Sequence, residues 1–204
     1  MLRIGRVLHG TTAEGPGSRT AVWVQGCSIR CKGCINPHLF SARGGELVDP
    51  EDLVAEAVSA GVEGLTLLGG EPFDQAAACA SLARRARKAG LGIICFTGYT
   101  RESLEQDEVA ASLIAEIDLL VDGPYLIDCP EEERALVGST NQRFIHLTTR
   151  YSGYDPSATP NRVELRIGLN GTIETAGFLT VDRLDSLNAS LETRRTFRRP
   201  STGP

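Results

Sequence analysis

The sequence predicts an α/β fold built around a parallel sheet, and three observations support this prediction. Short apolar segments alternate with stretches of helical periodicity through the middle of the chain, an order typical of parallel strands joined by helical crossovers. Several of these apolar segments run directly into glycine-rich or polar residues. The chain has 204 residues, 41% of them hydrophobic, which is enough for one substantial core.

The expected strands are short and apolar, and most are bounded by glycine or by polar turn residues. They alternate with the helical patterns, so each would return to the same sheet after a crossover. Five segments meet this description: Thr20–Gln25, Gly64–Leu68, Leu91–Phe96, Ile117–Val121 and Arg143–Leu147.

Three helices are expected between these strands. The first follows Asp49, a good N-cap residue before a first-turn proline, and Gly61 is a plausible stop. The second is expected over Gln75–Ala89 with Asp74 as its cap, and the third begins at Thr100. The apolar residues expected on the buried face of the third helix are Leu104, Val109 and Leu113.

The pattern changes after about residue 150. A stretch rich in Ser, Gly and Pro precedes two strand candidates, Arg162–Ile167 and Thr172–Ala176, which flank the hairpin signal Asn170-Gly171. A short helix is expected over Val181–Arg194, followed by a solvated, disordered arginine-rich end. We therefore divide the chain into a main domain, residues 1–150, and a C-terminal extension, residues 151–204.

Bulk composition excludes several classes of partner. The net charge of −5 and the pI near 5.3 give no sign of binding to nucleic acid or to an anionic membrane. No apolar stretch is long enough to span a bilayer, and the N-terminus lacks the features of a signal peptide. We expect a cytoplasmic protein, whose thiols stay reduced, which argues against a disulfide framework.

The most informative feature is the spacing Cys-x3-Cys-x2-Cys at Cys27, Cys31 and Cys34, directly after the first expected strand. Thiolates are soft ligands that suit iron–sulfur clusters or zinc. Three ligands on a four-iron cluster leave one iron free to bind a substrate. Two alternatives stay open from spacing alone: a disulfide, or a zinc knuckle completed by His38 or by a distant cysteine.

Three further motifs follow the next three expected strands, and their key residues are Gly69-Gly70-Glu71, Thr97-Gly98-Tyr99 and Asp122. In parallel α/β folds, binding sites form beyond the carboxyl ends of the strands. Glycine allows a ligand close to the backbone, Glu71 could accept from an ammonium group, and Thr97 could bond to a ribose or carboxylate. Ordinary turn geometry is the competing interpretation of each motif, and Asp122 could simply cap a turn.

Taken together, the motifs resemble a known family. The segments EGPGSR, WVQGCSIRCKGCINP, GGEP, FTGY, VDGPY and GSTNQR occur in this order within about residues 1–147. They are similar to those of radical S-adenosylmethionine activating enzymes, in particular the activases of anaerobic ribonucleoside-triphosphate reductase. The resemblance implies an incomplete parallel (βα) barrel with a [4Fe–4S] cluster and S-adenosylmethionine as cofactors.

The resemblance also assigns roles. Cys27, Cys31 and Cys34 would bind three irons, and the amino and carboxylate groups of S-adenosylmethionine would chelate the fourth. Reductive cleavage would give a 5′-deoxyadenosyl radical that abstracts hydrogen from a glycine of a partner protein, with Asp122 contributing to catalysis. Cofactor contacts would come from Gly33, Asn36, Gly69, Gly70, Glu71, Thr97 and Gly98.

The implied partners are a glycyl-radical protein, such as an anaerobic ribonucleotide reductase, and a low-potential electron donor such as flavodoxin. Several activases carry a basic residue two positions after the aspartate equivalent to Asp122, but this chain has Pro124, which puts a cationic clamp from that strand in doubt. Two other functions stay open: a radical enzyme acting on another protein or peptide, and a non-catalytic iron–sulfur or zinc module.

The remaining cysteines and histidines are not clustered with the motif. Cys79 on a helix face and Cys95 inside a strand are expected to be small core residues, whereas Cys129 in a polar loop is the plausible reactive thiol. His38 is expected at the surface, and His9 and His146 are isolated. The segment Asn141, Gln142 and Arg143 could contact the partner or serve the loop alone.

Overall fold

The computed structural model describes residues 1–178, 186 and 189. The expected helix Val181–Arg194 and the arginine-rich end fall almost wholly outside the described residues. Within the described part, none of the helices has both the length and the apolar character needed to cross a membrane.

A seven-stranded sheet in the order β3-β1-β2-β4-β5-β6-β7 forms the centre of the molecule. The four central strands β2, β4, β5 and β6 are parallel, as the alternating sequence pattern predicted. Described strands β3 and β7 form its two edges, so the sheet is open. The strands are β1 Leu2–Thr11, β2 Arg19–Val24, β3 Glu46–Val48, β4 Gly64–Gly69, β5 Gly92–Phe96, β6 Leu119–Asp122 and β7 Arg143–His146.

The outer strands correct the sequence prediction. Strand β7 was expected to continue the parallel sheet, but it runs antiparallel to β6, because the connection between them is a loop rather than a helical crossover. Strands β1 and β3 were not expected, and they extend the opposite edge in antiparallel fashion. The sheet is therefore mixed, with a parallel centre.

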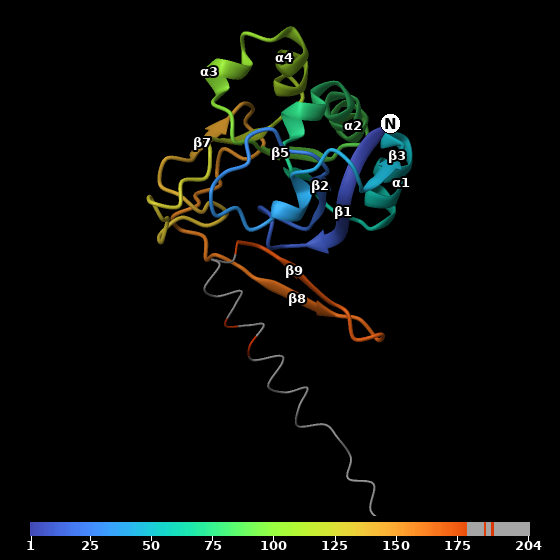
Figure 1. Ribbon diagram of the computed structural model, residues 1–204. Helices are drawn as coiled ribbons and strands as arrows, with labels where there is room; N and C mark the ends of the chain where they lie inside the picture. The colour runs from blue at the N-terminus through green and yellow to red at the C-terminus, as the bar shows by residue number, and fades with distance from the viewer. Residues whose placement is uncertain (179–185, 187–188, 190–204) are drawn as a thin grey trace, which may run out of the picture.

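The helices cover one face of this sheet (Figure 1). The main core lies between them and the sheet, and it includes Leu65 and Leu67 of β4, Ile93 of β5 and Leu82. Cys79 and Cys95 belong to this core, as predicted. The helices are α1 Pro50–Ser59, α2 Ala76–Lys88, α3 Arg101–Leu104 and α4 Glu108–Ile114.

Two of the three N-cap residues predicted from the sequence cap their helices in the structure, and one does not. The Asp49 carboxylate accepts from the backbone of α1, and the Thr100 hydroxyl accepts from that of α3, as expected for N-caps. Asp74, however, does not cap α2, because a 3₁₀ turn, Pro72–Gln75, precedes that helix. The Asp74 carboxylate instead accepts from Ser28 in the cysteine loop, at 2.6 Å from its backbone nitrogen.

The expected third helix is divided. Asp107 interrupts it, since its carboxylate accepts from two backbone N–H groups and so starts α4 as a new helix. Leu104 and Leu113 are buried as predicted, but Val109 lies in the first turn of α4 and is 50% exposed. The prediction that Val109 faces inward was wrong because the helical phase restarts at Asp107.

The predicted C-terminal hairpin is present as β8 Glu164–Ile167 and β9 Ile173–Ala176, paired antiparallel. It lies against β1, on the face of the sheet opposite the helices (Figure 1). The Thr11 hydroxyl donates to the Glu164 carboxylate at 2.8 Å, and the Arg166 guanidinium donates to the His9 carbonyl at 2.8 Å. These contacts fix the hairpin over the second sheet face.

Arg19 holds the amino ends of the parallel strands together. Its guanidinium is fully buried and donates to the carbonyls of Leu65 and Gly92 and to the hydroxyls of Thr66 and Tyr151. Burial lowers the pKa of Arg19, although Tyr151 and the charge of Glu63 act to raise it. Arg19, the last residue of the EGPGSR segment, therefore serves the fold at the amino end of the parallel strands.

Candidate functional site

The three motif cysteines lie on the loop that leaves the carboxyl end of β2. All three thiols are free and partly exposed. The base of the loop is fixed where the Gly26 N–H donates to the Leu39 carbonyl at 2.8 Å. Strand β2 therefore delivers Cys27, Cys31 and Cys34 to one edge of the sheet.

The cysteine loop turns tightly because of its backbone conformation. Gly33 has φ +76°, in the left-handed region, and a Cβ there would contact the Ile127 side chain at 2.6 Å. Arg30 also has positive φ. Gly33 is thus required by the turn and by its close approach to Ile127.

The loop is equipped to hold sulfur-bound metal. The Asn36 N–H donates to Cys34 Sγ at 3.4 Å, and backbone N–H groups of Ile29 and Arg30 bond to the Cys27 thiol. Burial raises the pKa of both Cys27 and Cys34, and these N–H groups act in the opposite sense. Hydrogen bonds to sulfur are a known means of tuning iron–sulfur clusters.

Thiolates such as those of the motif suit either an iron–sulfur cluster or a zinc ion. Among the residues described, no three His, Cys, Asp or Glu side chains converge closely enough to hold a single metal ion. The sequence alternative of a zinc knuckle named His38 or a distant cysteine as the further ligand. His38 is exposed at the surface, as predicted.

The Gly-Gly-Glu motif after β4 packs directly against the base of the cysteine loop. The Gly70 N–H donates to the Val24 carbonyl, and the Glu71 N–H donates to the Gly26 carbonyl, each at 2.8 Å. A Cβ at Gly70 would collide with the Gly26 carbonyl, and one at Gly69 would collide with the backbone of β2. Both glycines thus allow two neighbouring strand ends to approach each other.

Glu71 is buried at 2% exposure and links the ends of β4 and β5. Its Oε1 accepts from the Thr97 hydroxyl at 2.8 Å and from the Phe73 N–H at 3.0 Å, and its Oε2 accepts from the Gly98 N–H at 3.0 Å. Burial raises the pKa of Glu71 to about 7, although these hydrogen bonds act to lower it. Glu71, Thr97 and Gly98 therefore form one hydrogen-bonded unit.

The third motif contacts the cysteine loop as well. A Cβ at Gly98 would meet the Ile29 side chain at 2.7 Å. The hydroxyls of Tyr99 and Ser28 lie within hydrogen-bonding distance, at 2.8 Å, and Tyr99 also donates to Asp74 at 3.2 Å. The carboxyl ends of β2, β4 and β5 and their motifs thus meet at one site, as the sequence predicted.

Asp122 ends β6 and is fully buried. Arg143 of β7 donates from Nε to Oδ1 at 2.8 Å and from Nη2 to Oδ2 at 2.5 Å, and the Arg101 N–H donates to Oδ2 at 2.7 Å. Arg143 also pairs with Glu102 of α3, and the two ion pairs raise the pKa of Arg143. The cation beside Asp122 is therefore Arg143 of β7, which pairs with carboxylates of the protein itself.

Asn141 and Gln142 lie in the turn before β7 and bond within the protein. The Asn141 side chain donates to the Pro124 carbonyl at 2.8 Å, and Gln142 Oε1 accepts from the Gly138 N–H at 3.0 Å. These bonds support the loop-structural interpretation of the segment. Cys129 is exposed, as expected for the one accessible thiol outside the motif.

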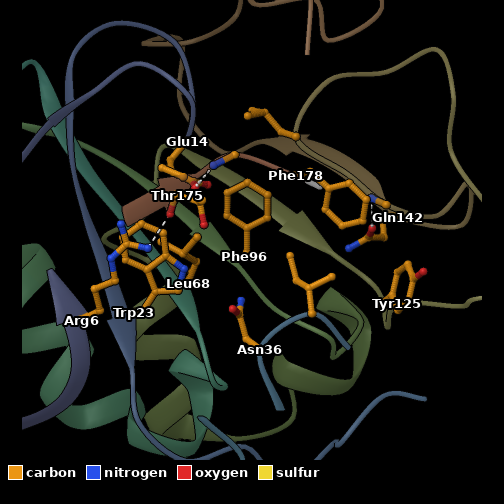
Figure 2. A pocket seen from close by; sticks show the side chains of 15 residues that line it. Arg6, Glu14, Trp23, Asn36, Leu68, Phe96, Tyr125, Gln142, Thr175 and Phe178 are labelled. Carbon is orange, nitrogen blue, oxygen red and sulfur yellow. Dashed lines mark hydrogen bonds between the residues drawn. The ribbon is translucent and has the colours of Figure 1, made fainter. Parts of the chain in front are cut away.

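A cavity of about 230 Å³ lies beside the cysteine loop, between the sheet and the C-terminal hairpin (Figure 2). Asn36 comes from the loop, Trp23 and Phe96 come from the sheet, and Phe178 follows the hairpin. The sequence did not indicate this cavity, because Arg6 and the hairpin residues that line it belong to no motif. Its remaining lining residues include Glu14, Leu68, Tyr125, Gln142, Thr175 and Gly177.

Comparison with known proteins agrees with this site. The model of the 4Fe-4S single cluster domain family matches residues 13–145. An anaerobic ribonucleoside-triphosphate reductase-activating protein of Enterobacteria phage T4 is 31% identical over 138 residues, covering 64% of this chain and 85% of the relative. The protein of the same name from Vibrio cholerae is 32% identical and covers 63% and 88%.

Another group of relatives carries the name of a different partner. Pyruvate formate-lyase 1-activating enzyme of Escherichia coli is 34% identical over 140 residues, 65% of this chain and 55% of that enzyme. A crystal structure of QueE from Escherichia coli matches 48% of this chain and 53% of its own chain, at 20% identity. Its TM-score of 0.38 is too low to bear on the fold.

A loop of three free thiols beside Gly-Gly-Glu and Thr-Gly-Tyr strand ends defines the class of single-cluster iron–sulfur proteins that use S-adenosylmethionine. Within that class, this chain belongs to the radical S-adenosylmethionine family of glycyl-radical activating enzymes. Membership implies a [4Fe–4S] cluster and S-adenosylmethionine, and it confirms the resemblance noted from the motifs.

Proposed function

We propose that this chain cleaves S-adenosylmethionine reductively and generates a glycyl radical on an anaerobic ribonucleotide reductase. The observation that carries the proposal is the meeting of the thiol loop with the ends of β4 and β5 at one edge of the sheet. Two relatives that match this chain over 85% and 88% of their own length act, by name, on that reductase. Their similarity supports the same partner here.

In this proposal Cys27, Cys31 and Cys34 hold the cluster, which when bound supplies the electron for cleavage of S-adenosylmethionine. Gly33 and Asn36 shape the loop, and the Asn36 N–H stabilises the Cys34 thiolate. The three thiols are free and reachable from solvent, as cluster assembly requires.

The S-adenosylmethionine site is proposed at the ends of β4 and β5, formed by Gly69, Gly70, Glu71, Thr97 and Gly98. Glu71 follows β4, the strand paired with β2 and its cluster loop, and its bonds to Thr97 and Gly98 keep its carboxylate in place to face an ammonium group. Asp122 completes the site from β6, and its pairing with Arg143 keeps its carboxylate fixed. Fixed polar groups bind a ligand without losing freedom of their own.

The open sheet is proposed to be an incomplete barrel of the radical S-adenosylmethionine type, formed by residues 1–150 and flanked by the extension 151–204. An incomplete barrel leaves one side accessible, which suits a loop of another protein better than a small molecule. A low-potential donor such as flavodoxin would supply electrons, and the protein would act in the cytoplasm.

The test uses the reduced, anaerobically reconstituted protein with S-adenosylmethionine and the anaerobic reductase of the same genome. We expect 5′-deoxyadenosine and the EPR doublet of a glycyl radical on the reductase. A matched reaction with Cys31→Ala should give neither product. If 5′-deoxyadenosine forms but every encoded glycyl-radical protein stays EPR-silent while another peptide is modified, the partner assignment is wrong.

A further inference from the structure

Asp74 holds the first turn of the cysteine loop, although its position in the sequence suggested a helix cap. It lies in the 3₁₀ turn Pro72–Gln75, directly after the Gly-Gly-Glu motif. Its Oδ2 accepts from the Ser28 N–H at 2.6 Å, and its Oδ1 accepts from the Ser28 hydroxyl at 2.8 Å. Because Ser28 directly follows Cys27, the carboxylate binds the residue next to the first proposed cluster ligand.

Ser28 makes all the hydrogen bonds that attach this part of the loop to the remainder of the protein. In the described part of the chain, residues 28–35 form no other hydrogen bond to a group outside the loop 26–40. The Tyr99 hydroxyl lies 2.8 Å from the Ser28 hydroxyl and donates to Asp74 Oδ1 at 3.2 Å. The hydrogen-bonded attachment of the segment between the first two cysteines therefore depends on Asp74.

The turn that carries Asp74 is itself fixed to the sheet. The neighbouring Gln75 donates from Nε2 to the carbonyls of Gln25 at 3.0 Å and Arg3 at 2.8 Å. Its Oε1 accepts from the Arg3 N–H at 2.9 Å, and the Asp74 N–H donates to the Glu71 carbonyl at 3.1 Å. Groups around a metal site orient its ligands best when they stand on such a rigid support.

The charge of Asp74 is not neutralised by an ion pair. No Lys, Arg or His in the described part of the chain lies within ion-pairing distance of it. Burial is the main cause that raises the pKa of Glu71, and the charge of Asp74 adds to the rise. The field of Asp74 therefore extends into the site.

A charge at this position affects electron uptake. The reduction potential of an iron–sulfur cluster depends on the net charge around it, on hydrogen bonds to its sulfurs and on solvent exposure. Reduction adds one electron, and so one negative charge, to the cluster. A nearby carboxylate repels that charge and makes the reduced state less favourable.

We propose that Asp74 is a positioning residue of the cluster: its carboxylate anchors the turn after Cys27 through Ser28, and its unpaired charge lowers the reduction potential of the cluster. A reduced cluster of lower potential is a stronger electron donor, which suits the reductive cleavage of S-adenosylmethionine. The inference rests on the proposed ligands Cys27, Cys31 and Cys34, and it names a residue that sets their geometry and the potential of the bound cluster.

The first test is an anaerobic redox titration of the cluster-loaded protein, with dithionite as the reductant and EPR as the readout. Asp74→Asn removes the charge but keeps an oxygen that can accept from Ser28. The control Glu63→Gln removes the same charge at an exposed residue before β4, at the end of the strand away from the cysteine loop. The titration is made at low ionic strength, because salt screens the charge of an exposed side chain.

We expect the midpoint potential to shift to more positive values in Asp74→Asn and to stay at the wild-type value in Glu63→Gln. Bound iron and sulfide should equal those of the wild type in both variants. A wild-type potential in Asp74→Asn would overturn the proposal. Equal shifts in the two variants would overturn it as well, because they would reflect the net charge of the protein alone.

The second test measures the anchor in the cluster-free protein by amide hydrogen exchange. Asp74→Ala removes both acceptor oxygens, and because Asp74 is exposed the substitution leaves no buried cavity. Exchange at Ser28 should become roughly tenfold faster or more, since a hydrogen bond to a charged group is lost. Exchange at Leu67 in the core should not change, which would show that the fold is intact. Wild-type exchange at Ser28 in this variant would also overturn the proposal.

The outcomes separate this inference from the proposed function. If the wild-type protein assembles no cluster, the proposed function fails and the role of Asp74 fails with it. If the cluster assembles and cleaves S-adenosylmethionine while Asp74→Asn keeps the wild-type potential, only the role of Asp74 fails.

Discussion

Glu14 should make the stability of this protein depend on pH in a direction opposite to that of most carboxylates. The side chain is buried, and desolvation raises its pKa from 4.5 to about 7, while the Gly177 N–H and the Arg6 charge act to lower it. In the unfolded chain the same carboxyl ionises near 4.5. Between these two values the folded state binds the extra proton, so unfolding becomes easier as the pH rises.

The size of the effect follows from the shift. Below pH 4.5, Glu14 is protonated in both the folded and the unfolded state and contributes no pH dependence. Above about pH 7 it is ionised in both states, and the full loss of folding stability caused by its buried charge is present. Each pKa unit corresponds to about 1.4 kcal/mol, so between pH 5 and 8 the protein should lose roughly 2 to 3 kcal/mol through Glu14. For a chain of this length, that lowers the melting temperature by roughly 5 to 10 °C.

The assay compares the wild type with Glu14→Gln, which keeps an acceptor oxygen for Gly177 but does not titrate. Other groups titrate in the same range, and Glu71 does so with the same sign, so the informative quantity is the difference between the two proteins. Glu14→Gln should gain roughly 5 to 10 °C over the wild type between pH 5 and 8. Glu132→Gln, on an exposed loop, is the control. A constant difference across this range would refute the reasoning.

Two further predictions concern the cofactors. Replacing Cys27, Cys31 or Cys34 by Ala should abolish the cluster, which anaerobic analysis would show as a loss of bound iron and sulfide. The control Cys79→Ala, at a buried cysteine outside the motif, should keep its iron and sulfide. If Cys31→Ala retains the full iron and sulfide content, Cys31 is not a cluster ligand. Glu71→Ala should weaken the binding of S-adenosylmethionine by roughly 1.5–3 kcal/mol, measured by calorimetry. Glu71→Gln removes the charge but keeps the size of the side chain, so it separates the loss of charge from an effect on folding. Unchanged affinity in a variant with an intact cluster would contradict the assignment.

The sequence predicted the parallel centre of the sheet because its signals are local. Strands β4, β5 and β6 are short apolar segments, and the residues after each one mark the same edge. Asp49 and Thr100 could be assigned as caps because a cap and its helix are neighbours in the chain. The cysteine spacing was informative for the same reason, since all three ligands lie on one loop.

The features that the sequence did not reveal depend on distant parts of the chain. Asp74 has the position of a helix cap, but it bonds to Ser28, which lies 46 residues away. Arg6 donates to the Thr175 carbonyl, which lies 169 residues further along the chain. The direction of β7 was missed because only the pairing with β6 reveals that the connecting loop reverses the chain. Pairing across such distances leaves no periodic trace in the sequence.

The basic neighbour of Asp122 comes from tertiary structure and not from its own strand. The motif alone left Asp122 without a basic neighbour on its own strand. Because β7 pairs antiparallel with β6, Asp122 and Arg143 stand opposite each other in register. Cross-strand neighbours of opposite charge attract, and here the two-pronged contact is buried on the carboxylate side. Arg143, the last residue of the GSTNQR segment, therefore fixes the Asp122 carboxylate at the end of β6.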